Sequence, residues 1–347
     1  MFNNPLNGLG KTSNEKTEIS ADVMAKINAS GKLALEEKFE AVTQQRREQN
    51  LRTAVEQHKL VEALLGSTRY EQAPQTAHPP ELSKLKMLEK ISDEKYRNEN
   101  QRILDQRSKY SAARALTVRP FRTLDGEIGG IIGGIIGGIS DGIAEDTKLQ
   151  VLGAPYEAWS RSGGADGRGY HVAQAYADPL TGKFGFNHFA YGAQASSGAG
   201  IWVQFVPDPP LPRFVQIRPY CPYFYKWHDH AHFYVAHNNA GFGVLVFSWD
   251  MQGNDQRMEQ DYRYTIWSDG VSWLQDHDNP SGDAGDYENA FQWGNEAPYF
   301  EAHSGRIYKA AIWCHGSCDG DSGVFGDYGQ ASAAIDVSVP WVVVGQS

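Results

Sequence analysis

A run of isoleucine and glycine near the middle of the chain restricts its fold more than any other feature. Residues 128–139 contain only these two residue types, arranged in doublets that recur every four positions. A strand would spread the isoleucines equally over both faces, whereas a helix would gather Gly129, Gly133 and Gly137 on one face. The pattern therefore predicts a helical contact segment at residues 121–147, between two halves of unlike composition.

The glycine face of this predicted helix requires a partner. Each interior glycine costs about 1 kcal/mol relative to alanine, so the helix should not be stable alone in water. Without a Cβ atom, a second backbone can approach closely, as in GxxxG helix pairs. The predicted contact residues are Gly129, Gly133, Gly137, Ile131, Ile132, Ile135 and Ile136. They would meet either other subunits or a membrane, and a hinge is the third interpretation.

Charged and aromatic residues are divided unevenly on the two sides of the repeat. Residues 1–120 carry 20 basic and 16 acidic side chains, whereas residues 121–347 carry 12 and 26. All nine tryptophans lie at or beyond Trp159. The acidic half argues against nucleic acid as a partner, because binding to phosphates depends on basic side chains. The N-terminus lacks the basic and apolar regions of a secretory signal. We therefore expect a chain that is particle-associated or released by a non-classical route.

The N-terminal half is expected to be helical. Residues 1–17 are predicted to form an extended or disordered arm, and residues 18–120 a helical hairpin or coiled coil. An apolar stripe begins at Ile19, with Ser20 as the N-cap, and a wholly polar stretch interrupts it at residues 43–50. A second helix is predicted at residues 81–116, before Pro120. So thin a stripe is typical of helices that associate with each other, so the hairpin should contact its own copies or another protein.

Residues 148–347 have the pattern of an antiparallel all-β sandwich of jelly-roll type. Short apolar and aromatic runs alternate there with clusters of Gly, Pro, Asn and Asp. The predicted strands are residues 170–177, 184–191, 200–206, 213–218, 230–237, 241–249, 261–268, 298–303, 306–313 and 333–344. With the helical half, this pattern predicts a multidomain protein of the α+β class.

Three histidines at alternate positions are the strongest candidate for metal chemistry. His228, His230 and His232 would share one face of a strand, with about 6.6 Å between alternate residues. Two imidazoles at that spacing can hold one zinc or iron ion. A polar strand face and a pH-responsive histidine cluster are the alternatives. The sequence implies no other type of cofactor, so a divalent metal is the one cofactor expectation.

Acidic loops offer a second, weaker candidate, for calcium. Asp319, Asp321 and Asp327 lie in a glycine-containing loop, and residues 276–288 form a similar one. Hard cations bind several oxygens in such loops, although neither loop matches an EF-hand. A solvated acidic loop is the competing interpretation. Three cysteines form no complete disulfide set, so Cys314 and Cys318 are either a pair or buried thiols.

Aromatic residues of the acidic half are candidates for a ligand surface. Rings that would stack on sugars or enter a lipid interface are Tyr223, Tyr225, Trp227, Trp267, Trp273 and Trp293. Most rings of a sandwich are nevertheless expected in the core. The sequence contains no nucleophile elbow, phosphate loop or dinucleotide fingerprint, so we expect a protein without enzymatic activity.

These features together predict a self-assembling, non-enzymatic structural or binding protein. The helical region and the repeat would form a homo-oligomer, and the sandwich would present a face to a surface ligand, with glycan as the expected class. One alternative is a pore-forming protein that inserts the Gly/Ile segment into a membrane. Another is a metal-dependent β-barrel enzyme that uses the histidine strand.

Overall fold

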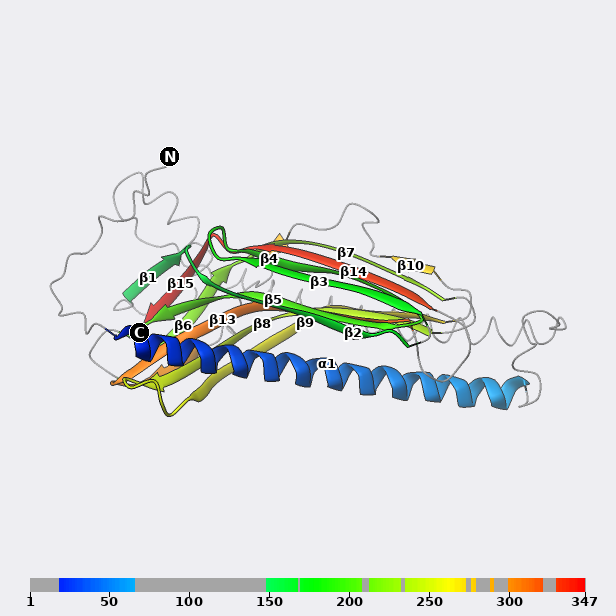
Figure 1. Cartoon of the computed structure of the whole chain (residues 1–347), viewed down its shortest axis with the longest axis horizontal. Helices are drawn as coiled ribbons and strands as arrows, with labels where there is room; N and C mark the ends of the chain where they lie inside the picture. The colour runs from blue at the N-terminus through cyan, green and yellow to red at the C-terminus, as the bar shows by residue number, and fades with distance from the viewer. Residues whose placement is uncertain are drawn as a thin grey trace, which may run out of the picture.

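The computed structural model describes residues 19–65, 148–167, 169–207, 212–231, 235–272, 276–278, 288–289, 299–320 and 329–346. These residues form one long helix followed by β-strands. The Gly/Ile repeat and the predicted second helix at 81–116 lie outside the described residues. Figure 1 shows the described part as layers, with two sheets above each other and the helix along the lower side.

Helix α1 (Ala21–Leu65) begins at its predicted cap. The Ser20 hydroxyl accepts a hydrogen bond from the backbone N–H of Val23 at 3.3 Å, which confirms that expectation. The helix then runs unbroken through the polar stretch at 43–50. The hairpin and the coiled coil are not confirmed, because the apolar stripe of α1 packs against strands of the same chain.

The described strands form three antiparallel sheets, and the predicted sandwich is confirmed in the two larger ones. The outer sheet joins β10 (Asp276–Asp278), β7 (Pro222–His230), β14 (Gln330–Ser338), β4 (Lys183–Tyr191) and β3 (Tyr170–Asp178), and β11 (Glu288–Asn289) also pairs with β7. The middle sheet joins β2 (Glu157–Ala165), β5 (Gln194–Phe205), β13 (Arg306–Asp319), β8 (Val235–Asp250) and β9 (Arg257–Ser272). The end sheet joins β1 (Lys148–Gly153), β15 (Trp341–Gln346), β6 (Arg213–Tyr220) and β12 (Tyr299–Ala302).

The central strands β8 and β13 of the middle sheet are buried on both faces, which explains the layered arrangement. Along β13, Tyr308 and Ile312 belong to the core shared with the outer sheet, whereas Ile307 and Trp313 belong to the core under α1. Successive side chains of a strand point to opposite faces, so one strand contributes to both cores. Every residue of β13 is buried. Such a strand has no exposed polar face, and residues 310–314 at its centre form an apolar run in the sequence.

The core under α1 joins a narrow helix stripe to large rings of the middle sheet. The helix contributes Ile27, Leu35, Phe39 and Val42, and the sheet contributes Trp159, Trp202, Leu245, Phe247, Trp249, Ile307, Ala311 and Trp313. Phe39 meets Trp159 edge to face, with ring centroids 5.7 Å apart. Because the sheet supplies most of the volume, few apolar helix positions are enough to bury this face.

Several strand predictions are wrong in their ends. The segment predicted as one strand at 230–237 is divided, because β7 ends at His230 and β8 begins at Val235. The strand predicted at 333–344 is interrupted near Pro340, after which β15 continues in the end sheet. Proline has no N–H for a ladder bond, which favours the change of sheet there. Strands β1 and β2 were not predicted. All three cysteines are buried thiols outside any disulfide, so Cys314 and Cys318 are not paired with each other.

Candidate functional site

The aromatic residues of β7 lie in the core. Tyr223, Tyr225 and Trp227 are each less than a tenth exposed, as is Trp267 of β9. Tyr225 stacks on Trp267, with centroids 5.1 Å apart. The two remaining predicted ring residues, Trp273 and Trp293, lie outside the described residues. The four described rings therefore join the outer sheet to the middle sheet and offer no surface on which a sugar could stack.

The predicted metal-ligating residues are only partly described. His228 and His230 are half-buried on the outward face of β7, and His232 lies outside the described residues. Asp319 is buried at the end of β13, where it accepts a hydrogen bond from Gln194 Nε2 at 3.4 Å. Asp321 and Asp327 again lie outside the described part. Within the described residues, no group of three or more His, Cys, Asp or Glu side chains is placed to hold a metal ion.

Two titratable residues are enclosed between the outer and middle sheets. Burial lowers the pKa of His188 to about 3, and neither of its ring nitrogens has a hydrogen-bond partner in the described structure. Burial, and secondly the charge of Asp269, raise the pKa of Asp229 well above its usual range. His188 lies on Phe186 with ring centroids 4.7 Å apart. These groups are closed to solvent, so their effect is on stability.

An exposed group of rings covers one edge of the outer sheet, and we call it the ring patch. Its members lie on the outward faces of β3 and β4 and are Tyr170, Val172, Tyr176, Phe189 and Tyr191. Tyr170 is 56% exposed, and its ring lies 5.6 Å from Phe189 and 6.0 Å from Tyr191. Single exposed apolar residues are ordinary, but contacting rings on one sheet face are typical of a binding surface.

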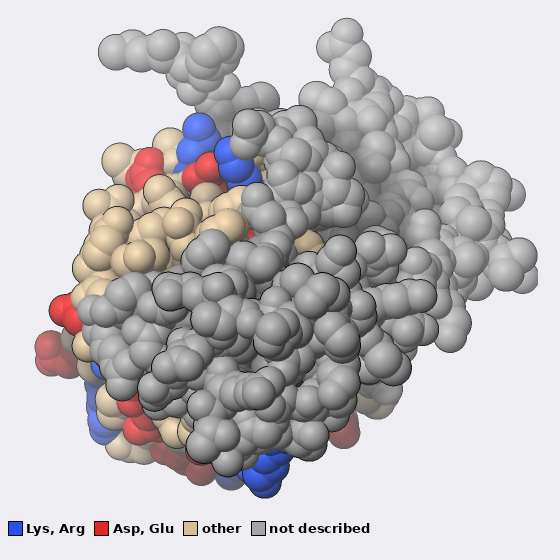
Figure 2. All heavy atoms as spheres, turned by 90° about the vertical axis from the view of Figure 1, so that its right-hand side faces the viewer, with Lys and Arg blue, Asp and Glu red and all other residues tan. Residues whose placement is uncertain are grey.

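Uncharged polar side chains lie beside the ring patch. Gln174 and Asn187 are directly paired across β3 and β4, and both are exposed. The Tyr176 hydroxyl donates a hydrogen bond to the Asp336 carboxylate, which fixes that ring. Figure 2 views the molecule from the right-hand end of Figure 1, and shows a largely uncharged surface at upper left, on the side of β3 and β4. The patch therefore combines ring faces with amide donors and acceptors.

The alternation along β3 is the signal from which the ring patch could have been predicted. Residues 170–178 place tyrosine, valine and glutamine at even positions and mostly alanine at odd positions. The alanines pack against the core, where Phe184 and Phe186 of β4 occupy the space. The larger side chains of β3 consequently point to solvent. In most strands the face with the larger apolar side chains packs on the core instead.

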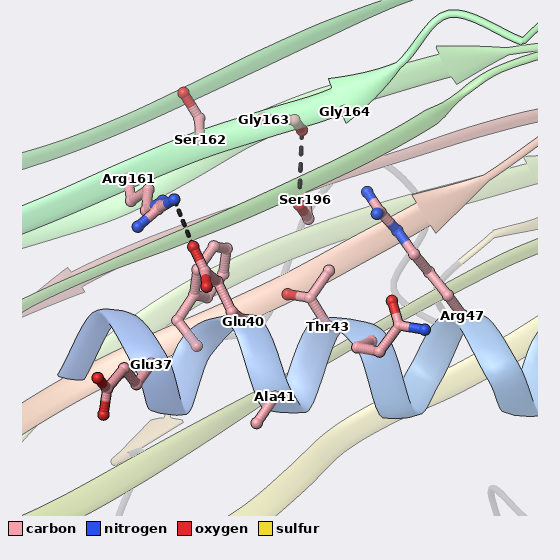
Figure 3. A pocket seen from close by; sticks show the side chains of 12 residues that line it. Glu37, Glu40, Ala41, Thr43, Arg47, Arg161, Ser162, Gly163, Gly164 and Ser196 are labelled. Carbon is pink, nitrogen blue, oxygen red and sulfur yellow. Dashed lines mark hydrogen bonds and ion pairs between the residues drawn. The ribbon is translucent and has the colours of Figure 1, made fainter. Parts of the chain in front are cut away.

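A second candidate site is an open groove between α1 and strand β2, of about 680 Å³. It is lined by Glu37, Phe39, Glu40, Ala41, Thr43, Gln44 and Arg47 of α1, by Arg161, Ser162, Gly163 and Gly164 of β2, and by Ser196 of β5. Figure 3 shows the helix on one side and the two strands on the other. The volume is in the range of pockets that hold small organic ligands.

The groove exists because the residues below this part of the helix are small. Phe39 fills the space over Gly198, where an added Cβ would lie 2.9 Å from its ring. Two residues further along β5 from Gly198, Ser196 pairs with Gly163 of β2 on one side and with Ser317 of β13 on the other. These three paired residues are all small, so none of them fills the space below the helix. The apolar interface therefore ends at Phe39 and Val42, and the groove opens beyond them.

Two arginines line the groove, and their surroundings differ. Arg161 Nη2 lies 2.5 Å from Glu40 Oε1, and its Nη1 lies 3.5 Å from Glu36 Oε2, so two carboxylates hold this guanidinium. Arg47 extends from α1 toward the strands in Figure 3. Within the described part of the chain, no ion pair or hydrogen bond joins Arg47 to another residue. Its guanidinium is thus available to a ligand.

Comparisons with known proteins leave the family open. No protein-family model and no curated protein matches the chain. TmCBM61 in complex with beta-1,4-galactotriose is 12% identical, with 53% of this chain and 86% of that chain covered and a TM-score of 0.16. The C-terminal family 22 carbohydrate binding module of Clostridium thermocellum Xyn10B is 12% identical, with 58% and 90% covered and a TM-score of 0.14. The VP2 protein of infectious bursal disease virus is 8% identical, with 58% and 36% covered and a TM-score of 0.15. Scores this low do not establish a shared fold, so function is argued from the residues of this chain.

Proposed function

We propose that this protein is a non-enzymatic binding protein whose outer sheet holds a glycan on the ring patch. The observation that carries the proposal is the exposed contact of Tyr170 with Phe189 and Tyr191. The apolar face of a sugar ring packs on an aromatic face, because both surfaces lose water on contact. Gln174 and Asn187 supply both donors and acceptors for sugar hydroxyls.

The chemistry of the patch favours a neutral sugar over a lipid surface. Membrane-interface proteins combine aromatic rings with lysine or arginine around them. Here the outward-facing neighbours Ser332, Ala334 and Asn187 carry no charge, and the charged neighbour bonded to Tyr176 is the acidic Asp336, not a lysine or arginine. Among the described helices, none is long and apolar enough to cross a membrane. A face with exposed rings and mostly uncharged neighbours suits a glycan chain that lies along the strands.

Self-assembly through residues 18–147 is the other part of the proposal. Figure 1 shows the C-terminal end of α1 running past the ends of the strands. Leu51, in the C-terminal half of α1, is 50% exposed. An apolar residue on a helix that extends beyond its own domain gains stability from contact with a second copy. The multivalent protein would then bind a glycan-coated surface more tightly than one copy does.

A binding measurement with single ring variants tests the glycan part. Immobilised neutral oligosaccharides of glucose, galactose and xylose would be screened first, and the best ligand titrated by calorimetry. Tyr170→Ala should weaken binding about tenfold, since one aromatic contact contributes about 0.5–1.5 kcal/mol beyond burial.

The matched control is Tyr220→Ala in the end sheet. Tyr220 is also a partly exposed tyrosine, and it stacks on Trp341 at 5.1 Å, far along the chain from the patch. Its loss should leave the affinity unchanged. Equal effects of the two substitutions, or no binding of any neutral oligosaccharide, would contradict the proposal.

A further inference from the structure

Gly163 has no packing reason to be glycine, unlike the residue that follows it. A Cβ on Gly164 would lie 2.1 Å from the carbonyl oxygen of Gln194 and 2.5 Å from the His171 ring, so Gly164 is required by close packing. A Cβ on Gly163 would meet no described atom within 4 Å. Glycine inside a strand costs about 0.5–1 kcal/mol relative to alanine. Such a glycine often marks a place where another molecule approaches the backbone closely.

The open space over Gly163 is part of the groove into which Arg47 projects. Glu40, the nearest acidic lining residue along the groove, is already paired with Arg161. Glu37 lies at the other end of the groove in Figure 3. The charge that faces the space over β2 is therefore the positive charge of Arg47.

Apart from Arg47, Glu37 and the Glu40–Arg161 pair, the groups around this space are uncharged. Thr43 of α1 and Ser196 of β5 provide hydroxyls, Gln44 provides an amide, and the glycines of β2 leave their backbone accessible. The Ser196 hydroxyl contacts the Gly163 carbonyl oxygen at 3.5 Å, the long limit of a hydrogen bond, so it can turn to a ligand. One guanidinium with several hydroxyl and amide groups matches a molecule with one carboxylate and several hydroxyls.

We propose that the groove between α1 and β2 binds an acidic saccharide, a sugar whose carboxylate pairs with Arg47 while its ring lies over Gly163. A guanidinium binds a carboxylate through two parallel N–H groups, which gives this contact its geometry. A phosphate dianion suits the groove less, because Glu36, Glu37 and Glu40 line or adjoin it and, of its two arginines, only Arg47 has no carboxylate partner in the described part. The volume of about 680 Å³ admits two or three sugar rings.

This site is independent of the ring patch. The groove lies between the helix and the middle sheet, whereas the ring patch lies on the outward face of the outer sheet. Either site can therefore be occupied without the other, and a variant of one leaves the other intact.

The test is a calorimetric titration of the full chain with trigalacturonate, galactotriose and inorganic phosphate. Arg47→Gln should weaken trigalacturonate binding at least tenfold, because the carboxylate loses its partner. Gly163→Leu should abolish it, since the new side chain fills the groove. Arg52→Gln is the matched control, because it removes the same charge from the same helix at a residue whose side chain is 80% exposed and paired only with Glu48 among the described residues.

The expected pattern is binding of trigalacturonate to the wild type and to Arg52→Gln, with little binding of galactotriose or phosphate to this groove. Gly163→Leu should melt at the wild-type temperature or above, because no described atom blocks the added side chain. Tyr170→Ala should leave trigalacturonate binding unchanged, which separates this site from the ring patch. The proposal is overturned if, in the Tyr170→Ala variant, trigalacturonate binds no better than galactotriose, if phosphate competes with trigalacturonate equally, or if Gly163→Leu binds trigalacturonate like the wild type.

Discussion

At the scale of single residues, burial determines what a side chain can do. Tyr225 and Tyr170 are the same residue type on two strands of one sheet, and their exposed fractions are 7% and 56%. The tyrosines of β7 were candidates for ligand binding because they are clustered with tryptophan in the sequence. Clustering along a strand does not reveal which face of the sheet is covered. The alternation along β3 carried that information, because alanine at every second position identifies a crowded face.

His188 should make stability depend on pH. Its pKa is lowered to about 3 by burial, so between about 3 and 6.5 the unfolded chain binds a proton that the folded chain does not. The free energy of unfolding therefore rises with pH across this window, by about 1.4 kcal/mol per pH unit for this residue, and the gain is complete above pH 6.5. His315, with its pKa also lowered to about 3, adds a slope of the same sign.

Replacing His188 by phenylalanine tests this account. The variant keeps a ring on Phe186 and removes two buried nitrogens without partners in the described structure, so its free energy of unfolding at pH 7 should rise by about 1–3 kcal/mol. The slope of its unfolding free energy against pH between pH 4 and 6.5 should decrease by about 1.4 kcal/mol per pH unit, which is the contribution of one proton. Urea unfolding at several pH values measures both effects, with His303→Gln at an exposed position as control. An unchanged pH slope would show that His188 does not titrate in this way.

At the scale of elements, α1 illustrates what a sequence pattern leaves undetermined. Its thin apolar stripe and its polar stretch at 43–50 predicted a helix that associates with other helices. The stripe instead meets large rings of the middle sheet, and the polar stretch lies over the polar row that contains Ser196 and Ser317. The position and N-cap of the helix could be predicted from local residues. Its partner could not, because β8 and β13 are buried on both faces and show no alternation that marks a helix-covered side.

Truncation of Phe39 should show that α1 belongs to the sandwich. Phe39 is 4% exposed and packs on Trp159, so Phe39→Ala should lower the free energy of unfolding by about 3–5 kcal/mol. Leu33→Ala is the matched control, because Leu33 lies on the same helix and is 57% exposed, and its effect should stay within about 0.5 kcal/mol. Urea unfolding followed by tryptophan fluorescence gives both values. If both substitutions changed the free energy of unfolding by similarly small amounts, α1 would not unfold cooperatively with the sandwich.

At the scale of the whole molecule, the two proposed ligand sites lie on opposite layers. The ring patch covers the outer sheet, and the groove lies on the helix side of the middle sheet. The sandwich class was predictable from the alternation of short apolar runs with turn residues. The sites were not, because each depends on which strand becomes an edge, and β2 and β3 are edges only after the sheets have formed.

Assembly remains a prediction for the full chain. Removal of residues 1–147 is a poor test, because it would uncover Trp159, Trp202 and Trp249 beneath α1 and expose a large apolar face. A single substitution in the Gly/Ile repeat avoids that problem. If the glycine face contacts another backbone closely, Gly133→Leu should disrupt the oligomer by overpacking, whereas Gly133→Ala should weaken it less. Sedimentation velocity of the three full-length proteins compares their masses. A monomeric wild type would remove the basis of the assembly proposal, and an unchanged oligomer in Gly133→Leu would exclude close packing at this glycine.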